Sequence, residues 1–228
     1  MTSSTQFTLL QQQIIDCRLC PRLVRWREKT AREKVKRFAD QEYWGKPIPG
    51  FGDPRARLLL VGLAPAAHGG NRTGRMFTGD NSGNWLYRAL HKAGFANQPL
   101  SEHRNDGLRL TDCYITATIR CAPPQNKPTP KEILNCKEFL LREIELLKNV
   151  RVIVGLGKIG FEAALEAYRE SGKIEFKSKP RFAHCAMYKI GGLTFIASFH
   201  PSQQNTFTGR LTEPMLDRVF TTARTQLQ

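Results

Sequence analysis

The sequence has no long apolar run. No stretch approaches the roughly 20 consecutive apolar residues that a membrane-spanning helix needs. The opening stretch, MTSSTQFTLLQQQ, also lacks the basic start and the apolar centre of a secretory signal. We therefore expect a cytoplasmic protein with no membrane partner.

Several sequence signatures are missing as well. Neither the GxxxxGK[ST] pattern of triphosphate-binding loops nor the GxGxxG pattern of dinucleotide-binding folds occurs. The compact three-cysteine motif of radical enzymes is also absent. Internal repeats and low-complexity linkers are absent too, and 228 residues suit one sizeable domain with a single core. We expect residues 1–228 to form that domain.

Acidic residues are scarce relative to basic ones. The chain has 35 Lys and Arg against 20 Asp and Glu, a formal charge of +15. Such an excess favours a polyanionic partner, nucleic acid above all, although a generally basic proteome would give the same count. Nine basic residues lie between Arg18 and Arg37. Residues 1–55 thus read as a basic arm whose helix covers the core. Its charges either form a solvated face or meet phosphates.

The cysteine pattern suggests a metal site. Cys17 and Cys20 form a CxxC pair, and Cys121 and Cys136 follow far along the chain. A disulfide framework is unexpected in a cytoplasmic protein, whereas four thiolates suit zinc or an iron–sulfur cluster. The spacing leaves both open, because zinc ribbons usually carry a second CxxC pair. Scattered core thiols are a third interpretation.

From residue 56 onward, short apolar strands alternate with helices. This order predicts an α/β fold with parallel strands and right-handed crossovers. Thr129, Pro130 and Glu132 give one helix start the pattern of a capping box. The predicted strands cover 57–63, 113–120, 150–157 and a segment from 193, and the predicted helices cover 82–94, 129–149, 158–172 and 212–226.

Ligands bind at the carboxyl ends of strands in such sheets, so we expect the functional residues in the loops that follow the strands. The loop 62–81 is rich in glycine, which lets a backbone approach a ligand closely. Arg72 and Arg75 can meet phosphates. Phe77 is either a core plug or a stacking face for a nucleobase. Asp80 stands near a helix start, so capping is its simplest role.

The loop after the last strand reads FHPSQQNTFTGRLT, over residues 199–212. His200 lies at a strand's carboxyl end, where it can donate a hydrogen bond to a ligand or serve as a structural residue. The following QQNTFTGR offers small polar groups, a phenylalanine and an arginine. This segment can press on a nucleic-acid groove.

Three long motifs together resemble the family 5 (type b) uracil-DNA glycosylases. They are GLAPAAHGGNRTGRMFTGDNSG, RCAPPQNKPTP and HPSQQNTFTGRLT, and the similarity covers nearly the whole chain from residue 14 onward. The resemblance implies a three-layer αβα fold with a central four-stranded parallel sheet. It also implies excision of uracil from DNA by a monofunctional enzyme that leaves an abasic site, and a monomeric state.

The related type a family differs at two positions. It carries an acidic residue where this chain has Leu63 and an asparagine where this chain has Ala117. The resemblance therefore suggests that Asp80 and Asn126 substitute for these groups, and that base specificity is looser. Hypoxanthine, xanthine and ethenocytosine join uracil as candidate substrates.

The resemblance also assigns roles in base excision, which requires the nucleotide to be flipped out of the duplex. Phe77 would stack on the base, Asn126 would hydrogen-bond to its edge, and His200 would donate to its carbonyl oxygen. Asp80 would stabilise the sugar cation or orient the attacking water. Backbone groups would line the pocket floor at Gly62, Ala64 and Ala66.

Deaminated double-stranded DNA is the implied partner, with single-stranded DNA as a second candidate. The segment 205–210 would enter the groove and keep the gap open. The residues expected to contact DNA are Arg72, Arg75, Ser202, Asn205, Thr206 and Arg210.

The family's cofactor is a [4Fe–4S] cluster, and the resemblance implies a structural role for it in ordering DNA-binding segments. A non-catalytic iron–sulfur nucleic-acid binder is an alternative, since it would keep the cysteines and the charge but need neither Asp80 nor His200. A zinc-containing nucleotide-binding protein is another. The ligands expected for the cluster are Cys17, Cys20, Cys121 and Cys136.

Overall fold

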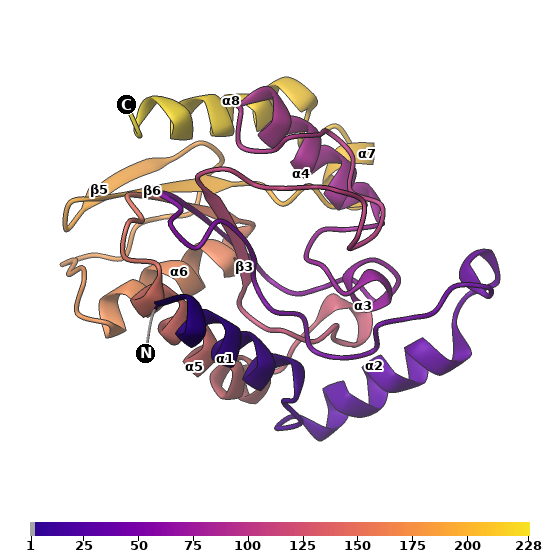
Figure 1. The fold of residues 1–228 in the computed structure, drawn as a ribbon. Helices are drawn as coiled ribbons and strands as arrows, with labels where there is room; N and C mark the ends of the chain where they lie inside the picture. The colour runs from indigo at the N-terminus through magenta and orange to yellow at the C-terminus, as the bar shows by residue number, and fades with distance from the viewer. Residues whose placement is uncertain (1–2) are drawn as a thin grey trace.

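The computed structural model describes residues 3–228, with side chains described from residue 5 onward. At its centre is one mixed sheet of six strands in the order β1-β3-β2-β4-β6-β5 (Figure 1). The inner strands β3, β2, β4 and β6 run parallel, and the edge strands β1 and β5 are antiparallel to their neighbours. The strands are β1 Phe51–Gly52, β2 Leu58–Gly62, β3 Cys113–Ala117, β4 Val152–Leu156, β5 Met187–Ile190 and β6 Leu193–Ser198.

The four predicted strands are confirmed as the parallel centre of the sheet, but a four-stranded sheet was an undercount. The first edge strand, Phe51–Gly52, has only two residues and lies in a stretch whose proline and glycine content predicts a loop. The other, Met187–Ile190, alternates exposed and half-buried residues. It returns into β6 through Gly191 and Gly192, both with positive φ. Neither edge strand has the apolar run that identifies a buried parallel strand.

The helices around the sheet begin and end close to the predicted positions. Thr129 caps α5 in a complete capping box with Glu132, as expected. None of the described helices is both long and apolar enough to cross a membrane. The α-helices are α1 Ser3–Ile15, α2 Pro21–Glu33, α3 Gly70–Thr73, α4 Asn81–Lys92, α5 Pro130–Leu146, α6 Lys158–Glu170, α7 Gln203–Phe207 and α8 Glu213–Thr225; the 3-10 helices are η1 Lys36–Phe38 and η2 Pro124–Asn126.

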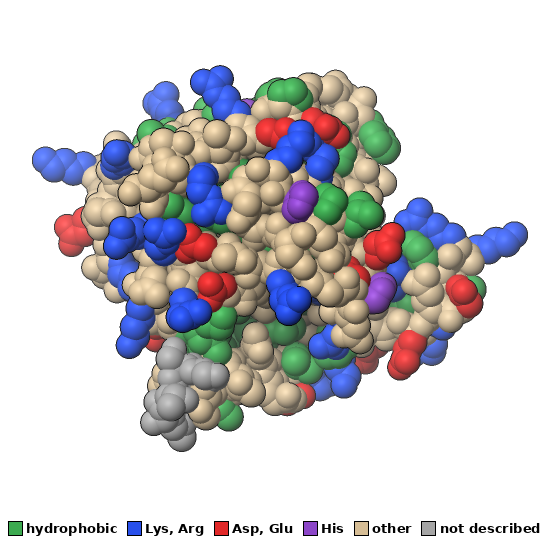
Figure 2. All heavy atoms as spheres, turned by 45° about the horizontal axis from the view of Figure 1, so that its top comes forward, with side chains coloured by type: hydrophobic (Ala, Val, Ile, Leu, Met, Phe, Trp, Pro, Cys, Tyr) green, Lys and Arg blue, Asp and Glu red, His purple; other side chains and the backbone are tan. Residues whose placement is uncertain are grey.

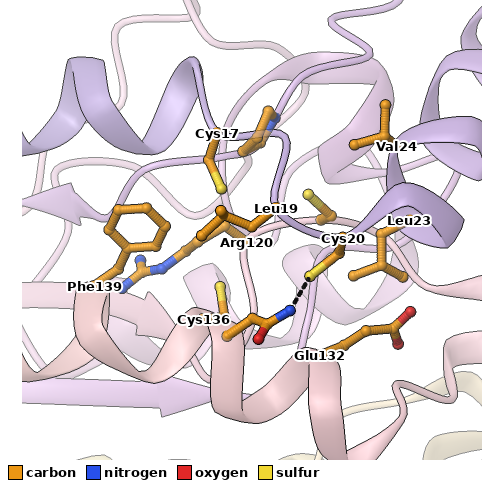
Figure 3. Close-up of a pocket in the computed structure, with 12 residues that line it drawn as sticks. Cys17, Leu19, Cys20, Leu23, Val24, Arg120, Glu132, Cys136 and Phe139 are labelled. Carbon is orange, nitrogen blue, oxygen red and sulfur yellow. Dashed lines mark hydrogen bonds between the residues drawn. The ribbon is translucent and has the colours of Figure 1, made fainter.

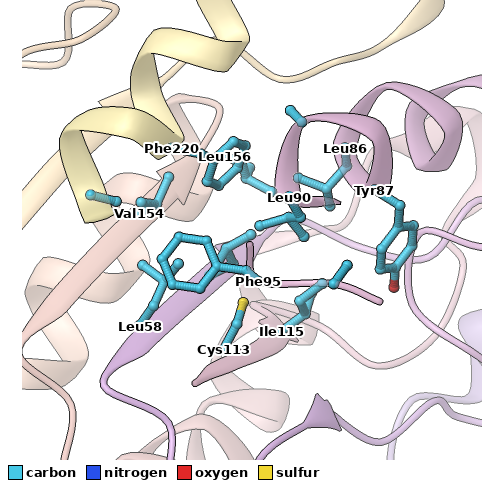
Figure 4. Close-up of a cluster of buried hydrophobic side chains, with 14 of the residues drawn as sticks. Leu58, Leu86, Tyr87, Leu90, Phe95, Cys113, Ile115, Val154, Leu156 and Phe220 are labelled. Atoms are coloured by element: carbon cyan, nitrogen blue, oxygen red, sulfur yellow. The ribbon is translucent and has the colours of Figure 1, made fainter. Parts of the chain in front are cut away.

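Two layers of helices cover the sheet, which confirms the αβα arrangement. Helices α4 and α8 lie on one face and α1, α5 and α6 on the other (Figure 1). The first face buries apolar side chains from every inner strand against Leu90, Phe95 and Phe220 (Figure 4). The second is packed around Phe161 of α6 and Phe195 of β6. Both faces are apolar, so the inner strands read as continuous hydrophobic runs.

The N-terminal arm contains two helices. Helix α1 packs against α5 through Leu10, Ile14 and Phe139. Its uncharged sequence gave no clear signal of a separate element. Helix α2 carries the basic residues and lies to one side of the sheet (Figure 1). Its first residue is Pro21, directly after Cys20, a position that suits proline.

Lys and Arg side chains are spread widely over the surface. Figure 2 shows them along the left margin and on the lobe at the right, where α2 and the turn after it lie, with fewer acidic groups between them. The net charge of +15 is thus distributed over a broad area. This distribution suits contact with an extended polyanion.

Candidate active site and cysteine pocket

Three of the predicted site residues meet at the carboxyl ends of the parallel strands. Phe77 and Asp80 belong to the loop between β2 and α4, and His200 follows β6. The rings of Phe77 and His200 are 5.7 Å apart between centroids, with 31° between their planes. Because β2 and β6 flank β4 on opposite sides, the two loops face each other across the end of β4.

Phe77 is held in an unusual backbone conformation. Its φ is 51°, in the left-handed region that residues other than glycine seldom adopt. Two glycines make room for it: a methyl group on Gly62 would lie 3.0 Å from the ring atom Cζ, and one on Gly83 would lie 2.0 Å from the Phe77 carbonyl oxygen. Backbone strain of this kind is often stored at functional sites. The side chain is half-buried, with part of the ring open to solvent.

Asp80 does cap α4, because its Oδ1 accepts a hydrogen bond from the backbone N–H of Gly83 at 2.9 Å. The other oxygen, Oδ2, lies against Gly69, where an added methyl group would approach it to 2.0 Å. Burial raises the pKa of the carboxyl above its usual value. Asp80 lines an open polar groove together with Arg37, Asn81 and others. Capping thus uses one oxygen and does not exclude a second role for the other.

His200 is neutral near pH 7, because burial lowers the pKa of its imidazole to about 4. A neutral ring still has one N–H to donate. The position of the residue is fixed through its main chain, whose carbonyl oxygen accepts a hydrogen bond from Nδ2 of Asn205 at 2.8 Å. This contact ties the histidine to α7. A second contact, from Nδ2 of Asn81 to Oγ1 of Thr206 at 3.3 Å, ties α7 to the start of α4.

The predicted pocket floor follows directly on β2. Gly62 is buried as the last residue of the strand, and its carbonyl oxygen accepts hydrogen bonds from the backbone N–H and the hydroxyl of Thr118 at 2.9 and 3.0 Å. Ala64 and Ala66 are half-buried, and the carbonyl oxygen of Ala66 accepts from the N–H of Asn71 at 3.0 Å. These three residues are small, so their side chains take up little room next to Phe77.

Asn126 stands apart from the other three. It lies in η2 with a φ of 57° and is exposed. None of the hydrogen bonds or ring contacts recorded over the described residues joins it to Phe77, Asp80 or His200. Its role at the base edge stays a prediction.

Arg72 and Arg75 are used inside the protein, which differs from the phosphate contacts predicted for them. Arg72 donates to the carbonyl oxygens of His68 and Gly79 at 2.8 and 2.7 Å. Arg75 is 4 % exposed and pairs with Asp106 at 2.6 Å. The sequence could not reveal these acceptors, because they come from loops whose course depends on the fold.

The segment after His200 forms the short helix α7. Ser202 caps it by accepting from the N–H of Asn205 at 3.4 Å. Arg210 is exposed and lies over the ring of Phe199 at 4.7 Å. Phe207 is 77 % exposed, the largest fraction among the exposed large hydrophobic side chains of the described chain. The predicted DNA contacts on this segment do not include this phenylalanine, because nothing in the local sequence shows how far its ring is exposed.

The four predicted cysteines line one pocket. Cys17 and Cys20 lie on the connection between α1 and α2, Cys121 follows β3, and Cys136 lies on α5. Figure 3 shows the sulfur atoms of Cys17, Cys20 and Cys136 turned toward the same space. The remaining lining is mostly apolar and includes Leu19, Leu23, Val24, Pro47 and Phe139.

Two side chains donate to these sulfurs. Arg27 donates from Nη1 to Sγ of Cys121 at 3.1 Å. Asn135 donates from Nδ2 to Sγ of Cys20 at 3.5 Å, the bond drawn as a dashed line in Figure 3. Burial raises the pKa of the Cys121 thiol to about 11 and that of Cys136 to about 12. Only a bound metal would make thiolates favourable here at neutral pH.

The four thiols carry the soft donor atoms that zinc or an iron–sulfur cluster takes. Over the described residues, no three His, Cys, Asp or Glu side chains are close enough together to bind one metal ion. A mononuclear zinc site would need its sulfurs at about 2.3 Å from one centre. The four cysteines come from three separate segments and line one mostly apolar pocket.

Comparison with known proteins identifies the family of the chain. Residues 49–224 match the family described as the uracil DNA glycosylase superfamily. The type-5 uracil-DNA glycosylase of Mycobacterium tuberculosis is 53% identical over 91% of this chain and 77% of its own length. That of Thermus thermophilus is 50% identical over 93% of this chain and 94% of its own. The type-4 enzyme of Thermotoga maritima is more distant, at 33% identity over 68% of this chain and 69% of its own length. The chain therefore belongs to the uracil DNA glycosylase superfamily and, within it, to the type-5 uracil-DNA glycosylases.

Proposed function

We propose that this protein is a uracil-DNA glycosylase, a hydrolase of base excision repair that removes uracil from DNA and leaves an abasic site. The observation that carries the proposal is the meeting of Phe77, Asp80 and His200 at the carboxyl ends of the parallel strands. An aromatic face, a carboxylate and a neutral imidazole are the groups that this hydrolysis requires around a flipped nucleotide.

The reaction breaks the bond between C1′ of the deoxyribose and N1 of uracil. The electron pair of that bond passes to the uracil ring, where it collects on a carbonyl oxygen, and the sugar becomes cationic. A water oxygen then bonds to C1′ and releases a proton. The protein therefore has to stabilise a developing anion on the base and a developing cation on the sugar.

Phe77 would hold the uracil ring by stacking, a contact that contributes about 1–3 kcal/mol per base. The ring is half-buried and contacts the Gly62 position at the end of β2, so a base would stack on its other face. His200 would donate its remaining N–H to the uracil oxygen. Because the pKa of His200 is about 4, the donor is a neutral imidazole and no proton is transferred to the leaving base.

Asp80 would act on the sugar side. Its Oδ1 is fixed by the Gly83 N–H, and the carboxylate would face the cation or the attacking water through Oδ2. A carboxylate stabilises positive charge more strongly in a water-poor site than in bulk solvent. The fixed helix start orients it before the substrate arrives, so little reorganisation is needed during the reaction.

DNA would lie across the groove beside Asp80 and against α7. The exposed ring of Phe207 is suited to fill the space left in the stack by the flipped nucleotide. Arg210 would meet a phosphate nearby. Deaminated double-stranded DNA is the proposed substrate, since a U·G mismatch opens at lower cost than a paired base. Single-stranded DNA would avoid that cost altogether.

A [4Fe–4S] cluster, held by Cys17, Cys20, Cys121 and Cys136, is the cofactor that the cysteine pocket supports best. When bound, it would supply structural order, tying α2 and α5 to the end of β3. The excision steps described above need no electron transfer, so the chain's own residues suffice for them.

Wider base specificity is a second part of the proposal. Leu63 and Ala117 are apolar where the related type a family has polar groups, so fewer contacts would select uracil alone. Hypoxanthine, xanthine and ethenocytosine are candidates. Asn126 is exposed, and its amide would hydrogen-bond to the edge of the flipped base.

The test is incubation of the protein with a duplex that carries one U·G pair, followed by alkali. Strand scission at the uracil and release of free uracil support the proposal, and an identical duplex with C·G gives the background. Binding without scission would favour a non-catalytic iron–sulfur protein instead. Parallel duplexes with hypoxanthine, xanthine and ethenocytosine then test the wider specificity.

A further inference from the structure

Arg27 is a buried cation beside the cysteine pocket. It lies on α2, is 2 % exposed, and donates from Nη1 to Sγ of Cys121 at 3.1 Å. Nη1 and Nη2 also donate to the carbonyl oxygen of Cys17 at 3.4 and 3.3 Å. The same guanidinium therefore contacts both cysteine-bearing segments, the one before α2 and the one after β3.

Within the described chain, the charge of Arg27 has no buried carboxylate partner. The nearest ion pair recorded for Arg27 over the described residues is with Glu28 at 4.0 Å, and Glu28 is partly exposed and already bound to Arg18 at 2.5 Å. The Nε of Arg27 is buried without a hydrogen-bond partner in the described chain. A buried cation normally requires a compensating anion, since its desolvation is costly.

Arg120 provides an internal comparison. It is also buried, at 1 % exposure, and lines the same pocket. Its guanidinium pairs with Glu143 at 2.6 Å, and Glu143 is itself 1 % exposed. The charge of Arg120 is thus compensated within the protein. Both arginines lie near a cysteine sulfur, Arg120 near Cys136 and Arg27 against Cys121, but only Arg120 has a buried carboxylate partner among the described residues.

We propose that Arg27 is the counter-charge of the iron–sulfur cluster and donates an N–H···S hydrogen bond to its Cys121 ligand. The inference rests on the cluster proposed above. A cluster held by four thiolates is an anionic group, and its reduction potential is set by net charge and by hydrogen bonds to the sulfurs. Arg27 supplies both, so it raises the potential and slows loss of iron.

Arg27 also connects this pocket to the site loop. Its backbone carbonyl oxygen accepts a hydrogen bond from Nδ2 of Asn71 at 3.2 Å, and Asn71 is buried in the loop that carries Phe77 and Asp80. Loss of the cluster would therefore also change the positions of the uracil-site residues, because α2 is hydrogen-bonded to their loop. Activity alone cannot isolate this effect, so the test uses the spectrum of the cluster.

The experiment compares the anaerobically purified wild type with Arg27→Gln and Arg25→Gln. Arg25 is exposed on the same helix, so the second variant removes the same charge from the surface. A potentiometric titration followed by visible absorbance gives the potential, and iron release to a chelator gives retention. We expect Arg27→Gln to lower the ratio of reduced to oxidised cluster at a fixed potential about tenfold. For a one-electron couple this corresponds to a reduction potential that is lower by 59 mV. Iron should also leave several-fold faster, while Arg25→Gln behaves as wild type.

The outcomes separate the two proposals. If the wild type contains no iron and sulfide, the cluster and the role of Arg27 fail together. A wild type with a cluster whose potential and iron release are unchanged by Arg27→Gln overturns the role of Arg27 alone. If Arg27→Gln does not fold by circular dichroism, Arg27→Lys is used. Lysine retains the charge without the guanidinium geometry, so it should keep the potential near wild type and release iron faster; wild-type values for both would refute the hydrogen bond.

Discussion

The ring of Phe77 rests against the α-carbon of Gly62. A methyl group placed on Gly62 would lie 3.0 Å from Cζ and 3.2 Å from Cε2 of that ring. Gly62 is the last residue of β2 and is fixed by its ladder with β3, so the strand cannot give way. The glycine therefore determines how deep the ring sits and how much space remains above it for a base.

The substitution Gly62→Ala should push the ring of Phe77 into the base slot. Because a displaced ring would hold the base in the wrong position, we expect the single-turnover rate on a U·G duplex to fall roughly tenfold to a hundredfold. Quenched-flow cleavage measures this rate. Phe77→Leu alone should also slow cleavage, through the loss of stacking worth about 1–3 kcal/mol.

The double variant Gly62→Ala with Phe77→Leu tests the contact directly. Leucine lacks the atom that the new methyl group would meet, so the added cost of Gly62→Ala should be much smaller in that background. Equal costs in both backgrounds would mean that Gly62 acts on the rate without touching the ring.

Asp80 has two functions that a single substitution can separate. Asparagine caps helices about as well as aspartate, so Asp80→Asn should keep the bond from Gly83 and leave the stability within about 0.5 kcal/mol. It removes the charge that faces the sugar, so the single-turnover rate should fall by about 10² to 10³.

Asp80→Ala serves as the comparison, because it removes both the cap and the charge. Its free energy of unfolding should drop by about 1 kcal/mol, measured by urea titration. If Asp80→Asn cleaves U·G duplex at the wild-type rate, the carboxylate has no part in the chemistry and capping is its whole role.

The sequence reveals the centre of the fold because the four inner strands are buried on both faces and read as apolar runs. It also places Phe77, Asp80 and His200, since loops after parallel strands converge at one edge of a sheet. Edge strands β1 and β5 carry no such signal. The local sequence pattern also does not predict which distant residues form pairs. Nothing in the sequence near Arg75 indicates that it will pair with Asp106.

The two arginines Arg75 and Arg210 should behave differently when changed to glutamine. Arg75→Gln breaks a buried pair with Asp106, whose pKa is lowered by that arginine and by backbone N–H groups. Leaving a buried carboxylate without its partner should cost about 3–5 kcal/mol of folding stability. Arg210→Gln should leave stability unchanged and reduce the slope of log affinity against log salt by about 1.

Fluorescence anisotropy of labelled duplex over a salt series measures the slope, and thermal unfolding measures the stability. Arg55→Gln is the control, since Arg55 is 89% exposed before β2, at the other end of the strand from the site. A reduced slope for Arg75→Gln with unchanged stability would restore the phosphate contact first predicted for it.

The pH dependence of cleavage follows from the two titratable groups of the site. Asp80 acts as a carboxylate and its pKa is raised by burial, so activity should be lost as pH falls through a value above the usual 3.8. His200 acts as a neutral ring with a pKa of about 4 and stays neutral over most of that range. Single-turnover rates from about pH 4 to 8 should therefore rise and then level off. In Asp80→Asn the loss of rate at low pH that is caused by protonation of Asp80 should disappear. If the rate of this variant falls at low pH as in the wild type, another group causes the loss.

The same histidine affects folding stability in the acid range. Its folded pKa of about 4 is below the ordinary value of 6.5, so the unfolded chain binds more protons between these values. Stability should fall as pH decreases from 6.5 toward 4, and the loss should be smaller in His200→Asn. Rates at low pH are compared only where circular dichroism shows a folded protein.

Phe207 should matter only when a duplex has to be opened. Its ring is 77 % exposed at the end of α7, and α7 is tied to the main chain of His200 through Asn205. Filling the gap in the stack offsets an unstacking cost of a few kcal/mol. Phe207→Ala should therefore slow cleavage of U·A duplex roughly tenfold to a hundredfold, slow U·G less, and leave a single-stranded substrate nearly unchanged. Phe207→Trp should retain the duplex rate, and Met187→Ala, which trims an exposed apolar side chain on β5, should change none of the three. Equal losses of cleavage rate on duplex and single-stranded substrates would mean that Phe207 contributes to DNA binding in general and does not fill the gap left by the flipped nucleotide.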